Sequence, residues 1–339
     1  MTGEWILVSP QRISRPWQGK MEKEPPRDAP AYDRECYLCP GNRRASGDTN
    51  PNYKKTFVFN NDFSALDQAP SAFKPTAAPL LRCESVKGTC RVICYSPRHD
   101  LTLPEMDEAA IQNVVETWME EHARLARVYK WIQFFENKGE TMGCSNPHPH
   151  GQVWALDRLT TVAGKEDACQ REYFAGRGSP LLLDYLGTEA KKGERMVVEN
   201  DHWAVLVPFW AVWPYETILV PKRHIPTISE LDAGERLTLA RILKALTVRY
   251  DNLMQTSFPY CMGWHSAPAV KGAGKYWQLH AHFFPPLLRS VKVRKFMVGF
   301  EMLSEPQRDI TPEDAAARLR EMPDVHYKSK GRRGGSARR

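Results

Sequence analysis

The most informative stretch of this chain is Gly143-Cys144-Ser145-Asn146-Pro147-His148-Pro149-His150-Gly151-Gln152-Val153-Trp154. It places two imidazoles two residues apart and a carboxamide two residues further on. Successive side chains of a strand alternate between its faces, so an extended backbone predicts that His148, His150 and Gln152 share one face. The two prolines exclude a helix and fit only an edge, a bulge or a strand start. Three polar groups on one face, followed by an apolar pair, indicate a site and not a core.

A lone His-x-His also occurs by chance, so the pattern needs support from elsewhere in the chain. The small residues at 143–146 permit close contact between the backbone and a ligand. A second such pattern, His280-Ala281-His282, lies in the other half of the chain. The two features together favour a functional interpretation.

Length and composition are those of an ordinary globular enzyme of one large domain or two. The 339 residues are 42% hydrophobic and 26% charged, with no apolar run long enough to cross a bilayer and no signal-peptide pattern. We therefore expect a cytoplasmic protein that does not bind membranes. The net charge of +7 includes six positive charges in the tail 328–339, which leaves +1 elsewhere. We predict that this basic tail is disordered and that the protein does not bind nucleic acid.

Eight cysteines without an export signal argue against a disulfide framework. Cys36 and Cys39 form a C-x-x-C pair that Pro40-Gly41 follows, as in a zinc knuckle. A redox pair and an inert turn are the alternatives, but a redox pair normally opens a helix, which Pro40-Gly41 disfavours.

The chain repeats one order of elements twice. A strand, a Pro-basic-His bend and a helix near 109–129 precede the first His-x-His, and the same order with a helix near 234–250 precedes the second. Short strands between few helices predict an α+β fold with a mostly antiparallel sheet, and not alternating βαβ units. We expect two similar halves, residues 1–160 and 161–327, joined by a linker at 157–192. No glycine-rich nucleotide motif is present.

The polar residues suggest both chemistry and metal binding. A neutral imidazole is a competent nucleophile toward phosphorus, and the Gln152 amide and Ser145 are suited to hydrogen-bond a phosphoryl oxygen. Cys36 and Cys39 need two further ligands, for which His99 and His148 are the best donors, giving a closed tetrahedral site. Three imidazoles, His265, His280 and His282, with a carboxylate suit zinc or iron, although His265 alone also fits a core histidine. We expect His224 to be structural and His122 and His326 to lie at the surface.

The chain resembles galactose-1-phosphate uridylyltransferases, the transferase branch of the histidine-triad superfamily. The resemblance runs from about residue 3 to 327. It is carried by the stretch 143–154, by Phe-Glu-Asn-Lys-Gly at 135–139, by Asn-Asp-Phe at 61–63, by Phe-Pro-Tyr-Cys-Met-Gly-Trp-His at 258–265, by Trp-Gln-Leu-His-Ala-His-Phe at 277–283 and by the segment 293–303. It implies duplicated histidine-triad-like halves and a homodimer. It also implies a ping-pong reaction in which His150 takes the uridylyl group of UDP-glucose and passes it to galactose 1-phosphate, while Gln152 hydrogen-bonds the phosphoryl group.

The resemblance also implies roles for individual residues. Cys36, Cys39, His99 and His148 match a zinc site of some members. Glu166, His265, His280 and His282 match a second structural site for iron or zinc, with the carboxylate the least well matched ligand. Substrate contacts are implied at Arg12, Arg15, Asn61, Asp62, Phe135, Asn137, Ser145, Gln152, Lys295, Phe296, Val298 and Gln307, the last four partly across a dimer interface.

Two alternatives remain open from the sequence. One is another nucleotidyl transfer, phosphorolysis or hydrolysis of the same superfamily, although hydrolases of this type generally carry a third histidine where this chain has Gln152. The other is a metal-stabilised protein that binds nucleotides without catalysis and contacts RNA through its tail.

Overall fold

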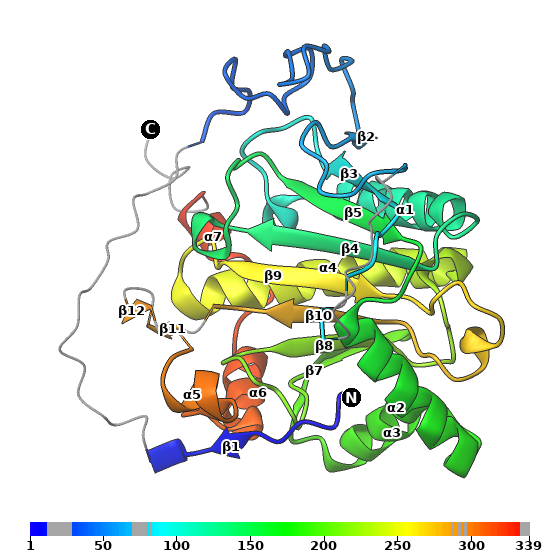
Figure 1. Ribbon diagram of the computed structural model, residues 1–339. Helices are drawn as coiled ribbons and strands as arrows, with labels where there is room; N and C mark the ends of the chain where they lie inside the picture. Colours follow the sequence, from blue (N-terminus) through cyan, green and yellow to red (C-terminus); the bar gives the residue numbers. More distant parts are fainter. Residues whose placement is uncertain are drawn as a thin grey trace.

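A single antiparallel sheet of nine strands organises the part of the chain that the computed structural model describes, residues 1–11, 29–69, 80–81, 83–286, 288–290, 293–294 and 297–332. The strand order is β2-β3-β5-β4-β9-β10-β8-β7-β6, and each neighbouring pair is antiparallel (Figure 1). The bounds are β2 Phe57–Asn60, β3 Gly88–Cys94, β4 Trp131–Lys138, β5 His150–Leu156, β6 Met196–Glu199, β7 Trp203–Leu206, β8 Thr217–Pro221, β9 Tyr260–His265 and β10 His280–Phe284.

The strand order shows a duplication. Strands β2-β3-β5-β4 of the first half correspond to β7-β8-β10-β9 of the second, and the two sets meet in mirror order where β4 pairs with β9. Along the chain, one long helix follows the second strand of each half: α1 (Glu108–Leu125) lies between β3 and β4, and α4 (Ala233–Met254) lies between β8 and β9. The predicted α+β class with a mostly antiparallel sheet in two similar halves is confirmed.

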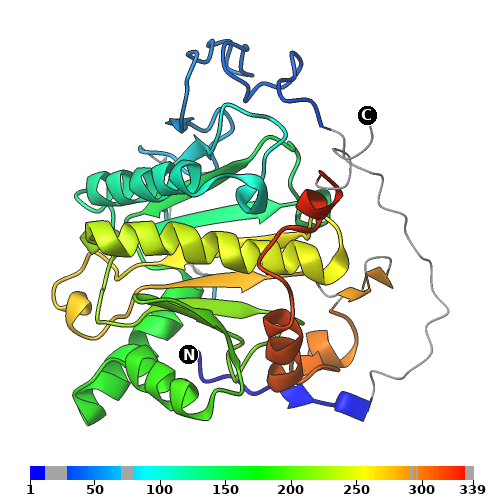
Figure 2. The ribbon, with the colours of Figure 1, turned by 180° about the vertical axis from the view of Figure 1, so that it is seen from behind.

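Helices α1 and α4 lie side by side across one face of the sheet (Figure 2). Each begins at an aspartate whose side chain accepts a backbone N–H of the first turn, Asp107 from Ala110 and Asp232 from Glu235. Helix α1 buries Ile111 and three further apolar side chains at helical spacing, Val114, Val115 and Trp118. The expected helix over 109–129 was too long, because α1 ends at Leu125 and residue 128 is exposed.

The segment that was expected to link the halves is itself helical. It forms α2 (Thr161–Arg177) and α3 (Leu181–Lys192), each ending at a glycine in the left-handed region, Gly178 and Gly193. Mixed charge suggested a linker because α2 has a weakly segregated apolar face. Its buried positions include Ala163 and the carboxylate of Glu166, so this helix contributes a polar group to the interior.

The C-terminal region packs at the β6 end of the sheet and along α4. Strand β1 (Leu7–Val8) pairs in parallel with β13 (Gln307–Arg308), and α6 (Pro312–Arg320) contacts β6. The hairpin β11 (Leu288–Ser290) and β12 (Val293–Arg294) precedes α5 (Phe300–Leu303). Helix α7 (Tyr327–Arg332) includes the first residues of the basic tail, so the expected disorder does not hold for residues 328–332. Residues 333–339 of the tail lie outside the described residues.

Candidate active site and metal clusters

The stretch from residue 143 to 154 enters the sheet at His150, the first residue of β5. His150 pairs with Cys94 on β3, and Gln152 pairs with Phe135 on β4. His148 precedes the strand and is buried among cysteine side chains. The expectation that His148, His150 and Gln152 share one face is therefore wrong for His148, because the prolines on either side of it keep it out of the ladder. It is right for His150 and Gln152.

His150 and Gln152 line a pocket whose other walls come from β4 and from the turn before β5. Five residues expected at the site from the sequence meet there: Phe135, Asn137, Ser145, His150 and Gln152. The remaining lining residues are Gly143, Cys144 and Gly151. The pocket brings together the residues of the motif at 143–154 with two alternate residues of β4, as strand periodicity requires.

The ring of His150 is oriented by its own chain. Its Nδ1 lies 2.7 Å from the carbonyl oxygen of His148, so Nδ1 carries the proton and donates it. Burial lowers the pKa of His150, although the bond to the His148 carbonyl opposes this shift. The imidazole is therefore neutral near pH 7, with an unprotonated Nε2.

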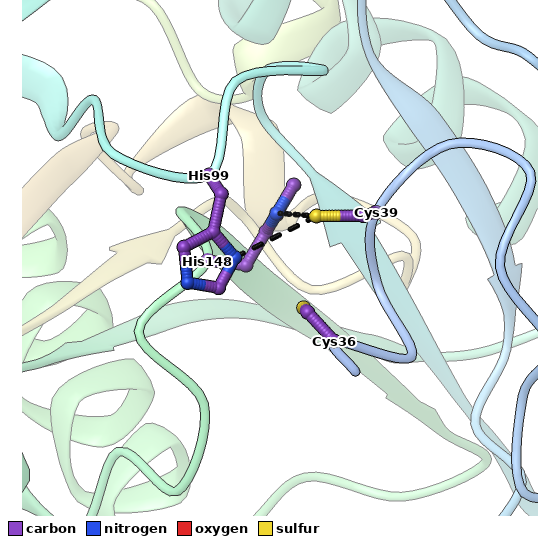
Figure 3. Close-up of side chains that lie close together, drawn as sticks. All are labelled: Cys36, Cys39, His99 and His148. Carbon is purple, nitrogen blue, oxygen red and sulfur yellow. Dashed lines mark hydrogen bonds between the residues drawn. The ribbon is translucent and has the colours of Figure 1, made fainter. Parts of the chain in front are cut away.

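The first cluster of candidate metal ligands joins three separate segments of the chain. One donor atom from each of Cys36, Cys39, His99 and His148 lies within 4.8 Å of all the others. Figure 3 shows the two imidazoles directed at Cys39, whose Sγ is 3.6 Å from His99 Nδ1 and 3.5 Å from His148 Nδ1. His148 Nε2 lies 2.8 Å from the carbonyl oxygen of Ser96, which fixes Nδ1 as the lone-pair donor toward the cluster.

The donor set of this cluster fits a bound cation. Two cysteines and two histidines form a closed tetrahedral set. Burial, followed by the nearby Cys36 thiol, raises the pKa of Cys39 to about 11, so its thiolate needs a positive charge. The backbone N–H of Leu38 already points at Cys36 Sγ, at 3.4 Å. The N-terminal segment is thereby tied to the turn that carries His150.

The second cluster lies between α2 and the β9–β10 pair. Glu166 Oε2 is 2.8 Å from His265 Nδ1 and 3.6 Å from His280 Nε2, and Glu166 Oε1 is 3.7 Å from His282 Nε2. Burial raises the pKa of Glu166, but the three imidazoles outweigh it and hold that pKa well below its usual range. The structure places Glu166 with the three histidines, as the resemblance implied.

Unpartnered atoms show that this cluster also fits a cation. His280 Nδ1 donates to the carbonyl of Gln278 at 2.8 Å, which leaves Nε2 as a lone-pair donor. Within the described part of the chain, the Nε2 atoms of His280 and His282 are buried without a hydrogen-bond partner. Burial also lowers the pKa of His282 to about 4, so its ring is neutral and able to ligate. Three imidazoles and a carboxylate form a ligand set for zinc or iron.

Other residues expected at the substrate site lie at varying distances from the pocket. Asn61 Nδ2 is 3.4 Å from Gln152 Oε1, whereas Asp62 accepts from the backbone of Ser46. Val298 is exposed before α5, and Gln307 is buried on β13, where it donates to Asp309; neither is among the described residues that line the pocket. Four of the expected substrate contacts lie outside the described residues: Arg12, Arg15, Lys295 and Phe296.

Three histidines outside the clusters are structural. His224 lies 3.1 Å from the carbonyl oxygen of Trp277. His122 and His326 are buried, with His122 Nδ1 3.0 Å from Ser229 Oγ and His326 Nε2 3.1 Å from Asp251 Oδ2. The expectation that these last two lie at the surface is wrong. Their partners are distant in sequence, so no local pattern indicated burial.

The geometry defines a class of protein: a duplicated antiparallel sheet with a free imidazole beside a carboxamide in a pocket, and with two clusters suited to metal ions. Residues 1–160 match the family described as galactose-1-phosphate uridyl transferase, N-terminal domain, and residues 166–331 match its C-terminal domain. The chain belongs to the galactose-1-phosphate uridylyltransferase family.

Individual relatives agree with this assignment. The chain is 52% identical to a galactose-1-phosphate uridylyltransferase of Haemophilus influenzae, over 96% of this chain and 94% of that one. It is 50% identical to a protein of the same name from Rattus norvegicus, over 96% and 86% of the two chains. A solved uridylyltransferase structure has a TM-score of 0.75 at 29% identity, covering 94% of this chain and 95% of that one.

One solved structure of lower sequence identity has a similar fold. An ADP-glucose phosphorylase of Arabidopsis thaliana has a TM-score of 0.74 at 23% identity, over 95% and 97% of the two chains, and so shares the fold. Among the helices of the described residues, none combines the length and the apolar character that a bilayer-spanning segment needs.

Proposed function

We propose that this protein transfers a uridylyl group from UDP-glucose to galactose 1-phosphate, with His150 as the nucleophile. The observation that carries the proposal is the hydrogen bond from His150 Nδ1 to the His148 carbonyl, because it leaves an unprotonated Nε2 in a pocket beside Gln152. Relatives that are about half identical over nearly the whole chain bear the name of this activity.

The reaction has two displacements at one phosphorus atom. The His150 Nε2 lone pair attacks the α-phosphorus of UDP-glucose, the bond to the β-phosphate oxygen breaks, and glucose 1-phosphate leaves with that electron pair. A phosphate oxygen of galactose 1-phosphate then attacks the same phosphorus, the N–P bond breaks, and UDP-galactose leaves. Imidazole suits both steps because it is a good nucleophile and a good leaving group. Gln152 would donate to a phosphoryl oxygen as charge develops there.

Contacts to the substrates follow from the pocket and from the resemblance. Asn61, Asp62, Phe135, Asn137 and Ser145 would bind the nucleotide, and Arg12 and Arg15 its phosphates. Lys295, Phe296, Val298 and Gln307 would complete the sugar-phosphate site. In this proposal the functional division of the chain falls at residue 160, with the nucleophile in residues 1–160 and the whole second cluster in residues 161–327.

The metals have a structural role in this proposal. Zinc would occupy the cluster of Cys36, Cys39, His99 and His148, and zinc or iron the cluster around Glu166. Zinc in a closed site supplies rigidity, and the residues that use it are His148, whose carbonyl orients His150, and the loop at 36–39. Free thiols in all eight cysteines are consistent with a reducing location such as the cytoplasm.

A homodimer is part of the same proposal. Exposed apolar side chains gather on β1 with the residues just before it, and on α5 with the segment before that helix: Trp5, Leu7, Val8, Val298, Phe300, Met302 and Leu303. A concentration of large apolar groups on the surface marks an interaction site. Val298 belongs both to this surface and to the segment expected to complete a substrate site, so the dimer and the site would share residues.

The test is to incubate the protein with uridine-labelled UDP-glucose and no acceptor. We expect release of glucose 1-phosphate and acid-labile label on the protein, discharged by galactose 1-phosphate as UDP-galactose. His150→Ala should take no label while keeping the thermal midpoint of the parent. Labelling that persists in His150→Ala, or a parent that takes no label, would refute the mechanism.

A further inference from the structure

We propose that the indole of Trp154 holds the Gln152 amide with its NH₂ group toward the pocket, so that Trp154 is a positioning residue for uridylyl transfer. This inference rests on the proposed function. It concerns which end of a carboxamide faces the phosphoryl group, since one end donates hydrogen bonds and the other accepts them.

The donor-only chemistry of the indole settles the orientation. Gln152 Oε1 lies 3.1 Å from Trp154 Nε1. An indole N–H can donate and never accept, so the amide atom that faces it must be the oxygen. A second donor converges on the same oxygen, because Asn61 Nδ2 lies 3.4 Å away.

The orientation of Asn61 is itself fixed by a backbone group. Asn61 Oδ1 accepts the backbone N–H of Phe63 at 2.9 Å. Because that N–H can only donate, the nitrogen of the Asn61 side chain is the end left for Gln152. The indole N–H of Trp154 thus holds Gln152 Oε1 directly, and the backbone N–H of Phe63 does so through Asn61. Both interactions keep Gln152 Oε1 away from the pocket.

Trp154 is well placed for this role. It follows Gln152 by two residues on β5, so both side chains project from the same face of the strand. Its ring packs edge-on against Phe135, with centroids 5.8 Å apart and planes at 73°. Phe135 lines the pocket, so the indole is fixed from the substrate side as well.

Losing the indole N–H would allow the amide to turn over. The turned amide presents Oε1 to phosphoryl oxygens, and two partial negative charges then face each other where charge increases in the transition state. The effect should therefore fall on the chemical step more than on UDP-glucose binding.

The experiment is a double-mutant cycle on the rate at which saturating UDP-glucose labels His150. Trp154→Phe keeps a ring against Phe135 but removes the donor, and we expect the rate to fall about fivefold to tenfold, the worth of one hydrogen bond, with KM changed less. In a Gln152→Ala background the same substitution should cause no further loss, because Trp154 acts through Gln152. Equal losses in both backgrounds, or no loss in the parent, would overturn the proposal.

Trp264→Phe is the matched control. Trp264 is fully buried, and its Nε1 has no hydrogen-bond partner among the described residues. This substitution therefore makes the same change in side-chain size without removing a hydrogen bond. It should leave the labelling rate of the folded protein unchanged. If Trp154→Phe does not fold, Asn61→Asp in the same cycle replaces the relayed donor by an acceptor and tests the same amide. A parent that takes no label refutes the proposed function itself, whereas an active parent with an indifferent Trp154 refutes only this inference.

Discussion

The two His-x-His motifs lie at the start of the corresponding strands β5 and β10, but they are offset by two residues: the first ends at His150, where β5 begins, and the second begins at His280, where β10 begins. In the first half His150 faces a pocket, whereas His148 turns to the cysteine cluster. In the second half His280 and His282 both lie on β10 and converge on Glu166. The second motif follows strand periodicity, whereas prolines hold His148 out of the strand in the first. Both strands thus begin at a histidine, but the other imidazole of the pair lies before the strand in the first half and on the strand in the second.

The same backbone device serves both motifs. His150 Nδ1 donates to the carbonyl two residues earlier, at 2.7 Å, and His280 Nδ1 does the same at 2.8 Å. In each case Nε2 is left with a lone pair, which one half directs at a pocket and the other at a carboxylate. The difference in role therefore comes from the groups around each imidazole, because the hydrogen bond at Nδ1 is the same in both.

The largest expected effect distinguishes the functional role of the first half from that of the second. His150→Ala should reduce the transfer rate by more than about 10⁴-fold, because it removes the nucleophile. His282→Ala should lower metal content but leave the labelling rate close to that of the parent, because His282 is not among the residues that line the pocket of His150. Single-turnover labelling, together with metal analysis, measures both. Loss of labelling in a folded His282→Ala protein would mean that the second half takes part in the chemistry.

Removing one ligand from each cluster should also give different results. Cys36→Ser should remove one metal equivalent and slow transfer on the order of 100-fold, because His148 and the carbonyl that orients His150 lose their anchor. Glu166→Gln should lower the other equivalent and the thermal midpoint by roughly 10 °C with little effect on the rate. Metal content, melting curves and labelling rates of both variants test this. Equal rate losses would show that the clusters are not functionally distinct.

Gly151 and Ala281 are the second residues of the corresponding strands β5 and β10, and they differ by one methyl group. A Cβ on Gly151 would lie 2.9 Å from Tyr95 Cζ and 3.0 Å from the Phe135 carbonyl oxygen, and closer still to the Tyr95 hydroxyl. The corresponding Ala281 is accommodated in a buried position. Gly151→Ala should therefore cost about 1–3 kcal/mol of stability and displace His150.

A second substitution tests the cause of that loss. Tyr95→Phe removes the hydroxyl group that the new methyl group would meet, so the pair Gly151→Ala/Tyr95→Phe should regain part of the stability lost by Gly151→Ala alone. Chemical denaturation of the four proteins gives the interaction energy. Strict additivity would show that the methyl group clashes elsewhere.

The sequence predicted two similar halves, the order of elements along each half and, apart from Glu166, both sets of candidate metal ligands, because these depend on motifs that are read locally. Glu166 was reached only through the resemblance, since mixed charge around it hid a helix. Partners that come together only in the fold were missed, such as Asp251 beside His326 and Ser229 beside His122. The turn of His148 away from His150 also depended on tertiary contacts, here with Cys39 and Ser96.

The smallest effect concerns the seam where the halves meet. Glu136 on β4 is buried and accepts from the hydroxyl of Tyr260 on β9 at 3.3 Å. Burial raises its pKa from 4.5 to about 7, against the opposing charge of Lys138. Between these values the folded state keeps a proton that the unfolded state has released, so this group contributes stability at low pH that is lost as the pH rises toward 7.

Glu136→Gln should remove this pH dependence, because the amide is neutral throughout. Relative to the parent, the variant should gain about 2 kcal/mol of unfolding free energy between pH 5 and pH 8, which denaturant titrations at the two pH values would measure. Replacement of the exposed Glu120 of α1 by Gln is the control for charge alone. Parallel pH profiles for Glu136→Gln and the parent would mean that Lys138 keeps Glu136 ionised. The hydrogen bond from Tyr260 of β9 would then be accepted by an ionised carboxylate of β4, and not by a neutral one.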